Sequence, residues 1–218
     1  MSETRKRGPA EAASSGPPAT PRPAAGIVLL RRGGKHAQRE LEVLLLKRTE
    51  RASFMPGVWV FPGGSVDPAD GEGEGGYRSC AVRELAEEAS IELPAEEELV
   101  LFSRWVTPEA ISTRFDAWFY LAMAPAHTPP KPDGVETTEA AWWKPAEVLE
   151  AHRAGEMAIS FPTVHQLSWL VPYATSDEAI AAYRGRKVDS VMPKIIDDRD
   201  GGGGWRPVLP GDPGHDEA

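Results

Sequence analysis

The chain has a single cysteine, Cys80, among its 218 residues, so an internal disulfide is excluded. This content is typical of a reducing compartment. No apolar run approaches the roughly 18 residues that a membrane-spanning helix needs. Positive charge is also scarce, because 24 Lys and Arg stand against 33 Asp and Glu, for a formal net charge of −9. We therefore expect a cytoplasmic protein with no membrane segment and no basic surface for a nucleic-acid polymer.

The length of 218 residues predicts one domain with extra segments, or at most two small domains. The hydrophobic content of 41% is enough for a core. Residues 1–23 are rich in Ala, Ser, Gly and Pro and lack the apolar stretch of a signal peptide, so we expect a disordered tail. A domain is predicted over residues 24–210, with a helical extension and a hairpin over about 160–210. Residues 211–218 are expected to form a flexible tail.

Short apolar runs punctuated by Gly and Pro indicate strands, and longer periodic segments indicate helices. Pro62-Gly63-Gly64 is interpreted as the turn that stops the third strand. The expected strands cover 24–32, 41–47, 58–61, 100–106 and 117–122, with another ending at Trp142-Trp143. The expected helices cover 77–89, 145–152 and an amphipathic stretch over 161–186, and 191–196 pairs with 205–209 across the turn Gly201–Gly204. This mixture predicts a layered α/β or α+β fold.

The helix over 77–89 carries three carboxylates on one face. Glu84, Glu87 and Glu88 stand at i, i+3 and i+4, which places them one turn apart. Such carboxylates repel one another unless a cation lies between them, and oxygen ligands suit Mg²⁺ or Mn²⁺. The alternative is a solvated acidic face, which is the commoner use of Glu-rich helices. A glycine turn before the helix favours a metal or phosphate site over a solvated face, because glycines let the backbone approach a phosphate or metal closely.

At these residues the sequence resembles a known family. Gly64 followed by Arg83-Glu84-Leu85-x-Glu87-Glu88-x-x-Ile91 is similar to the Nudix box, G-x5-E-x7-R-E-U-x-E-E-x-G-U, where U is aliphatic. The resemblance implies a Nudix-type α/β/α sandwich with a mixed sheet and a loop–helix–loop motif. It also implies hydrolysis of a diphosphate that joins a nucleoside to another group, with Mg²⁺ or Mn²⁺ as the cofactor.

Two departures from the box concern the loop and the helix end. Gly64 and Arg83 are 19 positions apart instead of 14, so the loop has a five-residue insertion. Counted back from Arg83, the first Glu of the box is replaced by Gly75, and Glu72 and Glu74 are candidates to replace it. Ser90 stands where the box has its second Gly, which predicts a differently shaped helix end.

The resemblance assigns roles to the core of the box. Arg83, Glu84 and Glu87 are the expected catalytic residues, with Arg83 orienting the carboxylates and Glu84 either binding metal or acting as the base. Glu84, Glu87 and Glu88 are the expected metal ligands, joined by the Gly64 carbonyl and by an acid on a later strand. Glu139 is the candidate for that acid, with Glu136 in reserve; a solvent-facing role for Glu139 is equally open.

A closer resemblance concerns the substrate. R-A-S-F-M-P-G-V-W-V-F-P-G-G-S-V-D (51–67), W-V-T-P (105–108), T-R-F-D (113–116) and V-L-P-G-D (208–212) are similar to segments of the acyl-CoA diphosphatase branch of the family. That branch would cleave CoA or acyl-CoA to 3′,5′-ADP and (acyl-)4′-phosphopantetheine. Arg114, Arg48 and Arg104 are candidate substrate contacts, each with a salt bridge or surface charge as the alternative. Whether the chain forms a homodimer is left open.

Two other functions compete with this prediction. A Nudix enzyme for ADP-ribose, NADH or an oxidised nucleotide would have the same metal site and differ only in its substrate pocket. A non-catalytic Nudix-fold module would belong to another class. Such modules usually lose acids of the R-E-U-x-E-E core, whereas all three Glu residues are present here.

Overall fold

The structure, a computed structural model, describes residues 17–33, 40–52, 55–94, 98–126, 128–197 and 205–215. The chain divides into two compact units. The larger comprises Ala24–Ser103 and Trp118–Val188, and the smaller comprises Met1–Pro23, Arg104–Ala117 and Asp189–Ala218. The tails predicted for 1–23 and 211–218 fall partly outside the described residues.

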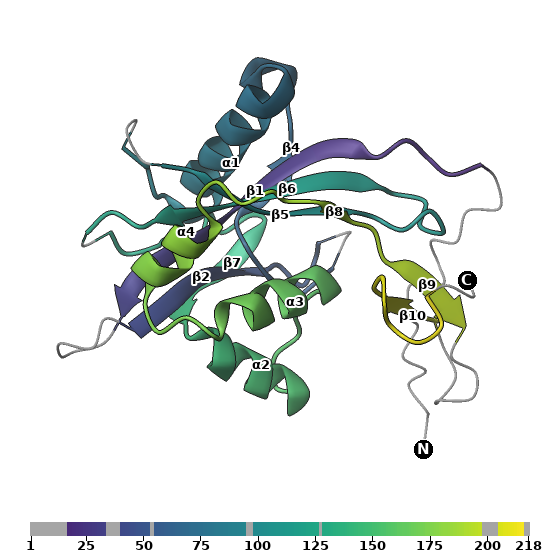
Figure 1. Ribbon diagram of the computed structural model, residues 1–218. Helices are drawn as coiled ribbons and strands as arrows, with labels where there is room; N and C mark the ends of the chain where they lie inside the picture. The colour runs from purple at the N-terminus through teal and green to yellow at the C-terminus, as the bar shows by residue number, and fades with distance from the viewer. Residues whose placement is uncertain are drawn as a thin grey trace. The chain divides into compact units, whose positions relative to one another are not determined.

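A sheet forms the centre of the larger unit (Figure 1). Its strands lie in the order β3-β2-β1-β6-β5, with β4 also paired to β1 and β7 to β2. The pairs of β1 with β2 and of β2 with β7 are antiparallel. The predicted strands are thus confirmed within a few residues. Their bounds are β1 Arg22–Gly33, β2 Glu40–Arg48, β3 Trp59–Val60, β4 Gly63–Ser65, β5 Val100–Val106, β6 Phe115–Met123 and β7 Thr137–Trp143.

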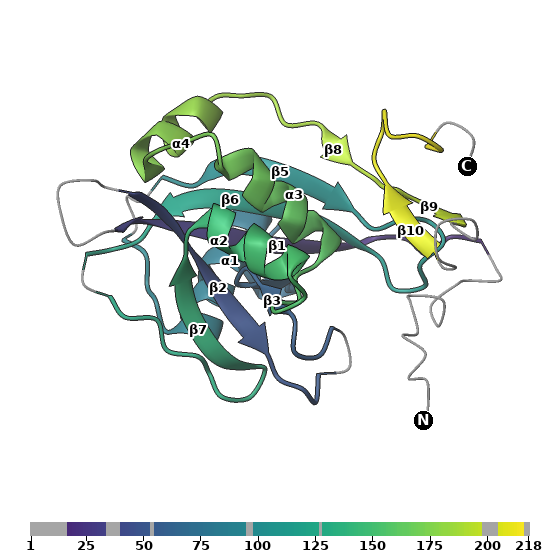
Figure 2. The ribbon, with the colours of Figure 1, turned by 90° about the horizontal axis from the view of Figure 1, so that it is seen from below.

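Alternate side chains of the central strands enter two separate cores, as the two-residue period of a strand requires. On β1, Val28 and Leu30 pack with α2, α3 and α4, whereas Ile27 and Leu29 pack with α1. All four are fully buried. The sheet therefore lies between α1 on one side and the other helices on the opposite side (Figure 2). The predicted α/β/α sandwich is confirmed.

Helix α1, Gly73–Ala89, begins four residues before the predicted start, so part of the Gly- and acid-rich segment is helical. Its buried side chains include Cys80, Leu85 and Glu88. The helix ends at Ser90, whose backbone is left-handed with φ 55° and ψ 36°. This conformation normally favours glycine, which explains in physical terms why the box has Gly at this position.

The opposite side of the sheet carries three helices. They are α2 Pro145–Arg153, α3 Phe161–Leu170 and α4 Ser176–Tyr183. Pro145 begins α2, as predicted. The single amphipathic stretch predicted over 161–186 is instead two helices. Thr175 forms a capping box with Glu178, and this local signal starts a new helix after the α3 end.

The prediction that Gly63 and Gly64 form a turn is wrong, because both belong to strand β4. Gly63 pairs with Gly26 of β1, and Gly64 pairs with Ala25. A Cβ on Gly63 would lie 2.6 Å from the Ala25 carbonyl oxygen, and one on Gly26 would lie 2.8 Å from the Pro62 carbonyl oxygen. The glycines thus allow a close strand pairing that residues with side chains would prevent.

In the smaller unit, the end of β5 pairs in parallel with β8, Ser190–Val191. The strands β9, Lys194–Asp197, and β10, Trp205–Val208, form the predicted antiparallel pair. The predicted first strand of this hairpin is therefore divided between β8 and β9, and the predicted turn Gly201–Gly204 lies outside the described residues. Over the described parts of the chain, none of the helices is both long and apolar enough to cross a membrane.

Candidate active site

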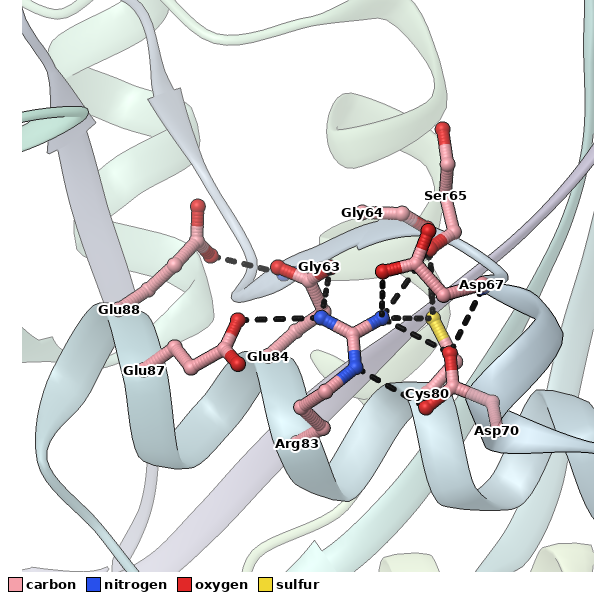
Figure 3. A network of polar contacts seen from close by, with 10 residues as sticks. All are labelled: Gly63, Gly64, Ser65, Asp67, Asp70, Cys80, Arg83, Glu84, Glu87 and Glu88. Atoms are coloured by element: carbon pink, nitrogen blue, oxygen red, sulfur yellow. Dashed lines mark hydrogen bonds and ion pairs between the residues drawn. The ribbon is translucent and has the colours of Figure 1, made fainter.

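The backbone of β4 lies directly against the acidic face of α1. The amide of Gly63 donates a hydrogen bond of 2.9 Å to Glu88 Oε2. The carboxylate of Glu84 occupies the space that a side chain at Gly64 would need, so any Cβ there would collide with it. The two glycines therefore serve both the pairing with β1 and the approach of two carboxylates (Figure 3).

Arg83 connects the helix to the loop that precedes it. Its Nε and Nη2 donate to the two carboxylate oxygens of Asp70 at 2.9 and 2.8 Å. Its Nη1 donates to Glu84 Oε1 at 2.8 Å and to Glu87 Oε2 at 3.0 Å, and its Nη2 also reaches the Ser65 carbonyl at 3.2 Å. The paired geometry with Asp70 is the strong, directional kind of arginine contact. Asp70 thus fixes the guanidinium through Nε and Nη2, and Nη1 orients two carboxylates of the helix (Figure 3).

Asp70, which accepts two hydrogen bonds from Arg83, was not among the residues expected from the sequence. It lies in a short 3-10 helix, Pro68–Asp70, and its side chain is only 4% exposed. The hydrogen bond from Arg83 is the main reason that the pKa of Asp70 is lowered. Counted forward from Gly64, Asp70 stands at the position of the first box Glu, so the five extra residues follow it. Counting backward from Arg83 concealed this match.

The two acids proposed for that position do something else. Glu72 is the N-cap residue of α1, where its side chain makes no capping hydrogen bond. Glu74 forms an ion pair with Arg78, with Oε1 and Nη2 2.8 Å apart. The acid that holds Arg83 in the described structure is Asp70, and neither candidate is needed for this contact.

Burial raises the pKa values of the Glu84 and Glu88 carboxyl groups. Glu88 is 5% exposed, and burial raises its pKa to about 7; the Gly63 amide opposes this rise, whereas the charges of Glu84 and Glu136 add to it. Burial likewise raises the pKa of Glu84, against the hydrogen bond from Arg83. Glu87 is more accessible, with 60% of its side chain exposed. Buried acids whose ionised form is disfavoured are those that a nearby cation would stabilise most.

The side-chain directions bear on metal binding. Glu84 and Glu87 turn toward Arg83, while Glu88 turns toward Gly63 (Figure 3). Within the described residues, no three acidic, His or Cys side chains are grouped closely enough to hold a metal ion. The donor chemistry nevertheless fits a hard divalent cation, because α1 offers the carboxylate oxygens of Glu84, Glu87 and Glu88 within little more than one helical turn.

Glu139 and Glu136, the two candidates for a further acid, differ in their surroundings. Glu139 forms an ion pair with Lys47, with Oε1 and Nζ 2.8 Å apart, and its side chain is 56% exposed. The charge of Glu136 contributes to the raised pKa values of both Glu84 and Glu88. Glu136 is therefore close enough to α1 for its charge to act on both helix carboxylates.

Two of the three candidate arginines lie in the smaller unit. Arg114 is buried and donates to the carbonyls of Thr107 and Ala19, at 3.0 and 2.7 Å. Arg104 donates to both carboxylate oxygens of Asp116, at 2.7 and 2.6 Å. Arg104 therefore forms an ion pair and Arg114 holds backbone carbonyls, so both have structural contacts within the smaller unit.

Arg48, in the larger unit, is the candidate arginine whose charge acts on the acidic helix. Its charge lowers the pKa of Glu88. It also lines a cavity of about 610 Å³ at the end of β2.

Cys80 lies beneath this network. Its thiol approaches the carbonyls of Gly64 and Ser65, at 3.6 and 3.4 Å. Burial raises its pKa to about 12, so the reactive thiolate is scarce at neutral pH. Cys80 is therefore a packing residue in the described structure.

The fold and the site together define a class of α/β/α proteins. In this class an acidic helix, whose carboxylates are held by an arginine, lies against a short strand that contains two glycines. The model of the NUDIX domain family matches residues 20–164, which is more than half of the chain. The chain therefore belongs to the Nudix family.

Two curated proteins are similar in sequence. A putative nudix hydrolase 7 of Caenorhabditis elegans is 29% identical over 162 residues, covering 59% of this chain and 55% of that protein. The acyl-coenzyme A diphosphatase NUDT19 of Xenopus laevis is 24% identical over 261 aligned residues, covering 74% of this chain and 69% of that protein. The chain thus spans about half the length of the first relative and about two thirds of the second.

Solved structures share the fold. A NUDIX hydrolase from Alicyclobacillus acidocaldarius superposes with a TM-score of 0.68 at 24% identity, covering 77% of this chain and 99% of that one. A MutT NUDIX hydrolase from Burkholderia pseudomallei gives a TM-score of 0.52 at 24% identity, covering 69% and 98%. At these identities the likeness supports the architecture alone.

Proposed function

We propose that the protein is a divalent-metal-dependent diphosphatase that cleaves CoA or acyl-CoA to 3′,5′-ADP and (acyl-)4′-phosphopantetheine. The observation that carries the hydrolytic part is the Arg83 network, which joins Asp70 to the complete acidic core of the Nudix box. The similarity to an acyl-coenzyme A diphosphatase, over 69% of that protein, supports the choice of substrate. The single cysteine supports a cytoplasmic location.

Glu84, Glu87 and Glu88 would hold Mg²⁺ or Mn²⁺, together with the Gly64 carbonyl. Burial without a cation disfavours the ionised forms of Glu84 and Glu88, and this is the fit that supports the assignment. When bound, divalent cations supply positive charge to the phosphate oxygens and make a coordinated water more acidic. Glu136 is the further acid we favour, in place of Glu139.

Arg83 and Asp70 are proposed as positioning residues. Arg83 keeps the carboxylate of Glu84 directed at the backbone of β4 and limits the rotation of Glu87. Asp70 would keep Arg83 in place whether or not cations are bound, because it holds two guanidinium nitrogens. Glu84 would then accept the proton of the attacking water or bind metal, as the resemblance to the family leaves open.

The substrate is tested with a panel of CoA, short- and long-chain acyl-CoAs, ADP-ribose, NADH, diadenosine polyphosphates and nucleoside triphosphates, each with Mg²⁺ or Mn²⁺. We expect kcat/KM to be highest for a CoA compound and the products to be 3′,5′-ADP and a phosphopantetheine, identified by mass spectrometry. Higher kcat/KM for ADP-ribose or NADH than for every CoA compound would refute the substrate assignment. No turnover of any compound would refute the enzyme assignment in favour of a binding module.

The site is tested by Glu87→Gln and Glu88→Gln, with Glu147→Gln on α2 as the control. Each site substitution removes one carboxylate charge and should lower kcat at least 100-fold while the circular dichroism spectrum stays that of the wild type. Titration calorimetry with Mn²⁺ should show weaker binding in both variants. Full activity and unchanged Mn²⁺ affinity in both variants would show that these carboxylates are not the site.

A further inference from the structure

A cavity of about 610 Å³ opens at the end of β2, where the chain leaves the sheet. Its lining comes from the segment after β2 and the segment before β7, and consists of Arg48, Thr49, Arg51, Ala52, Gly134, Val135 and Glu136. The volume exceeds what a single phosphate needs and suits a nucleoside-sized group. Two guanidinium groups stand against one carboxylate in this lining, so it favours an anion although the chain as a whole is acidic.

The cavity lies beside the acidic helix. Glu136 lines it, and the next residue, Thr137, donates its hydroxyl to the Glu88 carbonyl of α1 at 3.3 Å. The backbone ties its two walls together, since the Thr49 amide donates to the Glu136 carbonyl at 2.9 Å. A molecule whose diphosphate lies at the helix would therefore have a neighbouring part within reach of this cavity.

A β-bulge shapes the wall that carries Arg48. Lys47 pairs with Glu139 of β7, but Arg48 pairs with Thr137, so Thr138 is skipped. Bulges of this kind redirect side chains beside functional sites. The bulge lies between Lys47 and Arg48. The Lys47 side chain forms an ion pair with Glu139, whereas Arg48 lines the cavity.

The opposite wall is held rigid by Asp133. Its carboxylate accepts hydrogen bonds from the amides of Val135, Glu136 and Thr137, at 3.2, 3.0 and 2.8 Å, and from the Thr137 hydroxyl at 2.9 Å. The same hydroxyl contacts the Glu88 carbonyl at 3.3 Å. A fixed turn therefore presents Val135, 77% exposed, and Glu136 at the cavity before any ligand arrives.

We propose that this cavity binds a phosphorylated nucleoside end of the substrate, with Arg48 and Arg51 contacting a phosphate monoester that is separate from the diphosphate. The proposal rests on the proposed function, because CoA carries such a group as its 3′-phosphate. Two arginines that line one cavity match the charge of a phosphate better than a neutral ribose hydroxyl. The cavity would thereby distinguish CoA from dephospho-CoA.

The test compares Arg51→Gln, Arg48→Gln and the charge-preserving Arg51→Lys, with Arg153→Gln on the exposed side of α2 as the control. The ratio of kcat/KM for CoA to that for dephospho-CoA should fall 10- to 100-fold in each Gln variant. It should recover in part in Arg51→Lys and stay at the wild-type value in Arg153→Gln. An unchanged ratio in both Gln variants, or equal losses on both substrates, would overturn the proposal.

Binding without catalysis separates this inference from the proposed function. In metal-free buffer with a chelator, titration calorimetry compares adenosine 3′,5′-bisphosphate with 5′-AMP; neither contains a diphosphate. We expect the wild type to prefer the bisphosphate at least 10-fold, with the preference decreasing as salt rises and lost in Arg51→Gln. If CoA is not hydrolysed but this preference holds, the proposed function fails and the subsite stands. Equal affinity for both nucleotides would refute the subsite.

Discussion

The two faces of the central sheet bury different kinds of polar group. Toward α3 and α4, the buried polar residues are neutral and include Gln166, which donates to Ser103 at 2.9 Å. Toward α1, the buried groups include charged side chains, namely Glu88 and the carboxylate of Asp70. Neutral hydrogen-bonded groups are compatible with a stable core, whereas buried charges are expensive unless they are paired. The buried charges toward α1 therefore cost stability that the neutral polar groups toward α3 and α4 do not.

The largest effect on stability is expected on the side of the sheet toward α3 and α4, where the buried polar residues are neutral. Leu167→Ala removes a fully buried side chain of α3 and should lower the free energy of unfolding by about 2–5 kcal/mol. The kcat of the folded fraction should stay within twofold of the wild type. Urea unfolding measures the first quantity, and assays below the transition measure the second. Val171→Ala, at a half-exposed position, is the control. A large fall in kcat would show that the two faces are not functionally separate.

On the charged face, Asp70→Asn should affect activity more than stability. The substitution keeps the shape of the side chain but removes the charge that holds Arg83, so we expect kcat/KM to fall about 10- to 100-fold. The free energy of unfolding should fall by about 1–2 kcal/mol. Glu74→Gln, which removes the acid of an exposed ion pair, should change neither quantity appreciably. Wild-type activity in Asp70→Asn would exclude a role for the Arg83–Asp70 contact.

Glu88 should make the free energy of unfolding depend on pH in metal-free buffer. Its pKa is about 7 in the folded chain, above the ordinary 4.5, so the folded state holds the proton more tightly than the unfolded state. The resulting stabilisation is complete below about pH 4.5 and is lost as the pH rises through 7. Relative to Glu88→Gln, the wild type should therefore lose roughly 1–3 kcal/mol of stability between pH 5 and pH 8. Parallel pH profiles for the two proteins would contradict this.

The smallest effect concerns the end of α1. Ser90 has a left-handed backbone, so Ser90→Gly should relieve strain and stabilise the protein by about 0.5–1 kcal/mol. The melting temperature should rise by roughly 2–4 °C. The matched control is Ser168→Gly within α3, where glycine is unfavourable in a regular helix and should lower the melting temperature. Equal shifts in both variants would argue against backbone strain at Ser90.

Local patterns in the sequence predicted most of the fold. The buried run around Ile27 and the helical spacing of Glu84 and Glu88 indicate their elements directly, because the residues that decide them are neighbours. The β4 strand was missed because its pairing partner, Gly26, lies far away in sequence. Two helices were merged into one because the apolar pattern continues across the break at Thr175, where only the capping box marks a new start.

In the site, the acids on the helix were identified from spacing, and their roles stay predictions. The difference between Glu136 and Glu139 could not be derived from sequence, because it depends on which acid pairs with Lys47 and which acts on the carboxylates of α1. Asp70 could have been found by counting from Gly64 as well as from Arg83. An insertion inside a motif makes the two counts disagree, and only the contact with Arg83 decides between them.

The contact between Arg83 and Asp70 has a consequence for relatives with other loop lengths. Gly71 and Gly73, which follow Asp70, have positive φ angles of 96° and 61°, and a Cβ at either position would meet no atom within 4 Å. Closing a longer loop costs little extra free energy, since the cost grows only with the logarithm of its length. Insertions can therefore accumulate after Asp70 without displacing the acid that Arg83 grips. Alignments of this box should be anchored independently at its glycine and at its arginine, with the gap left free to fall between them.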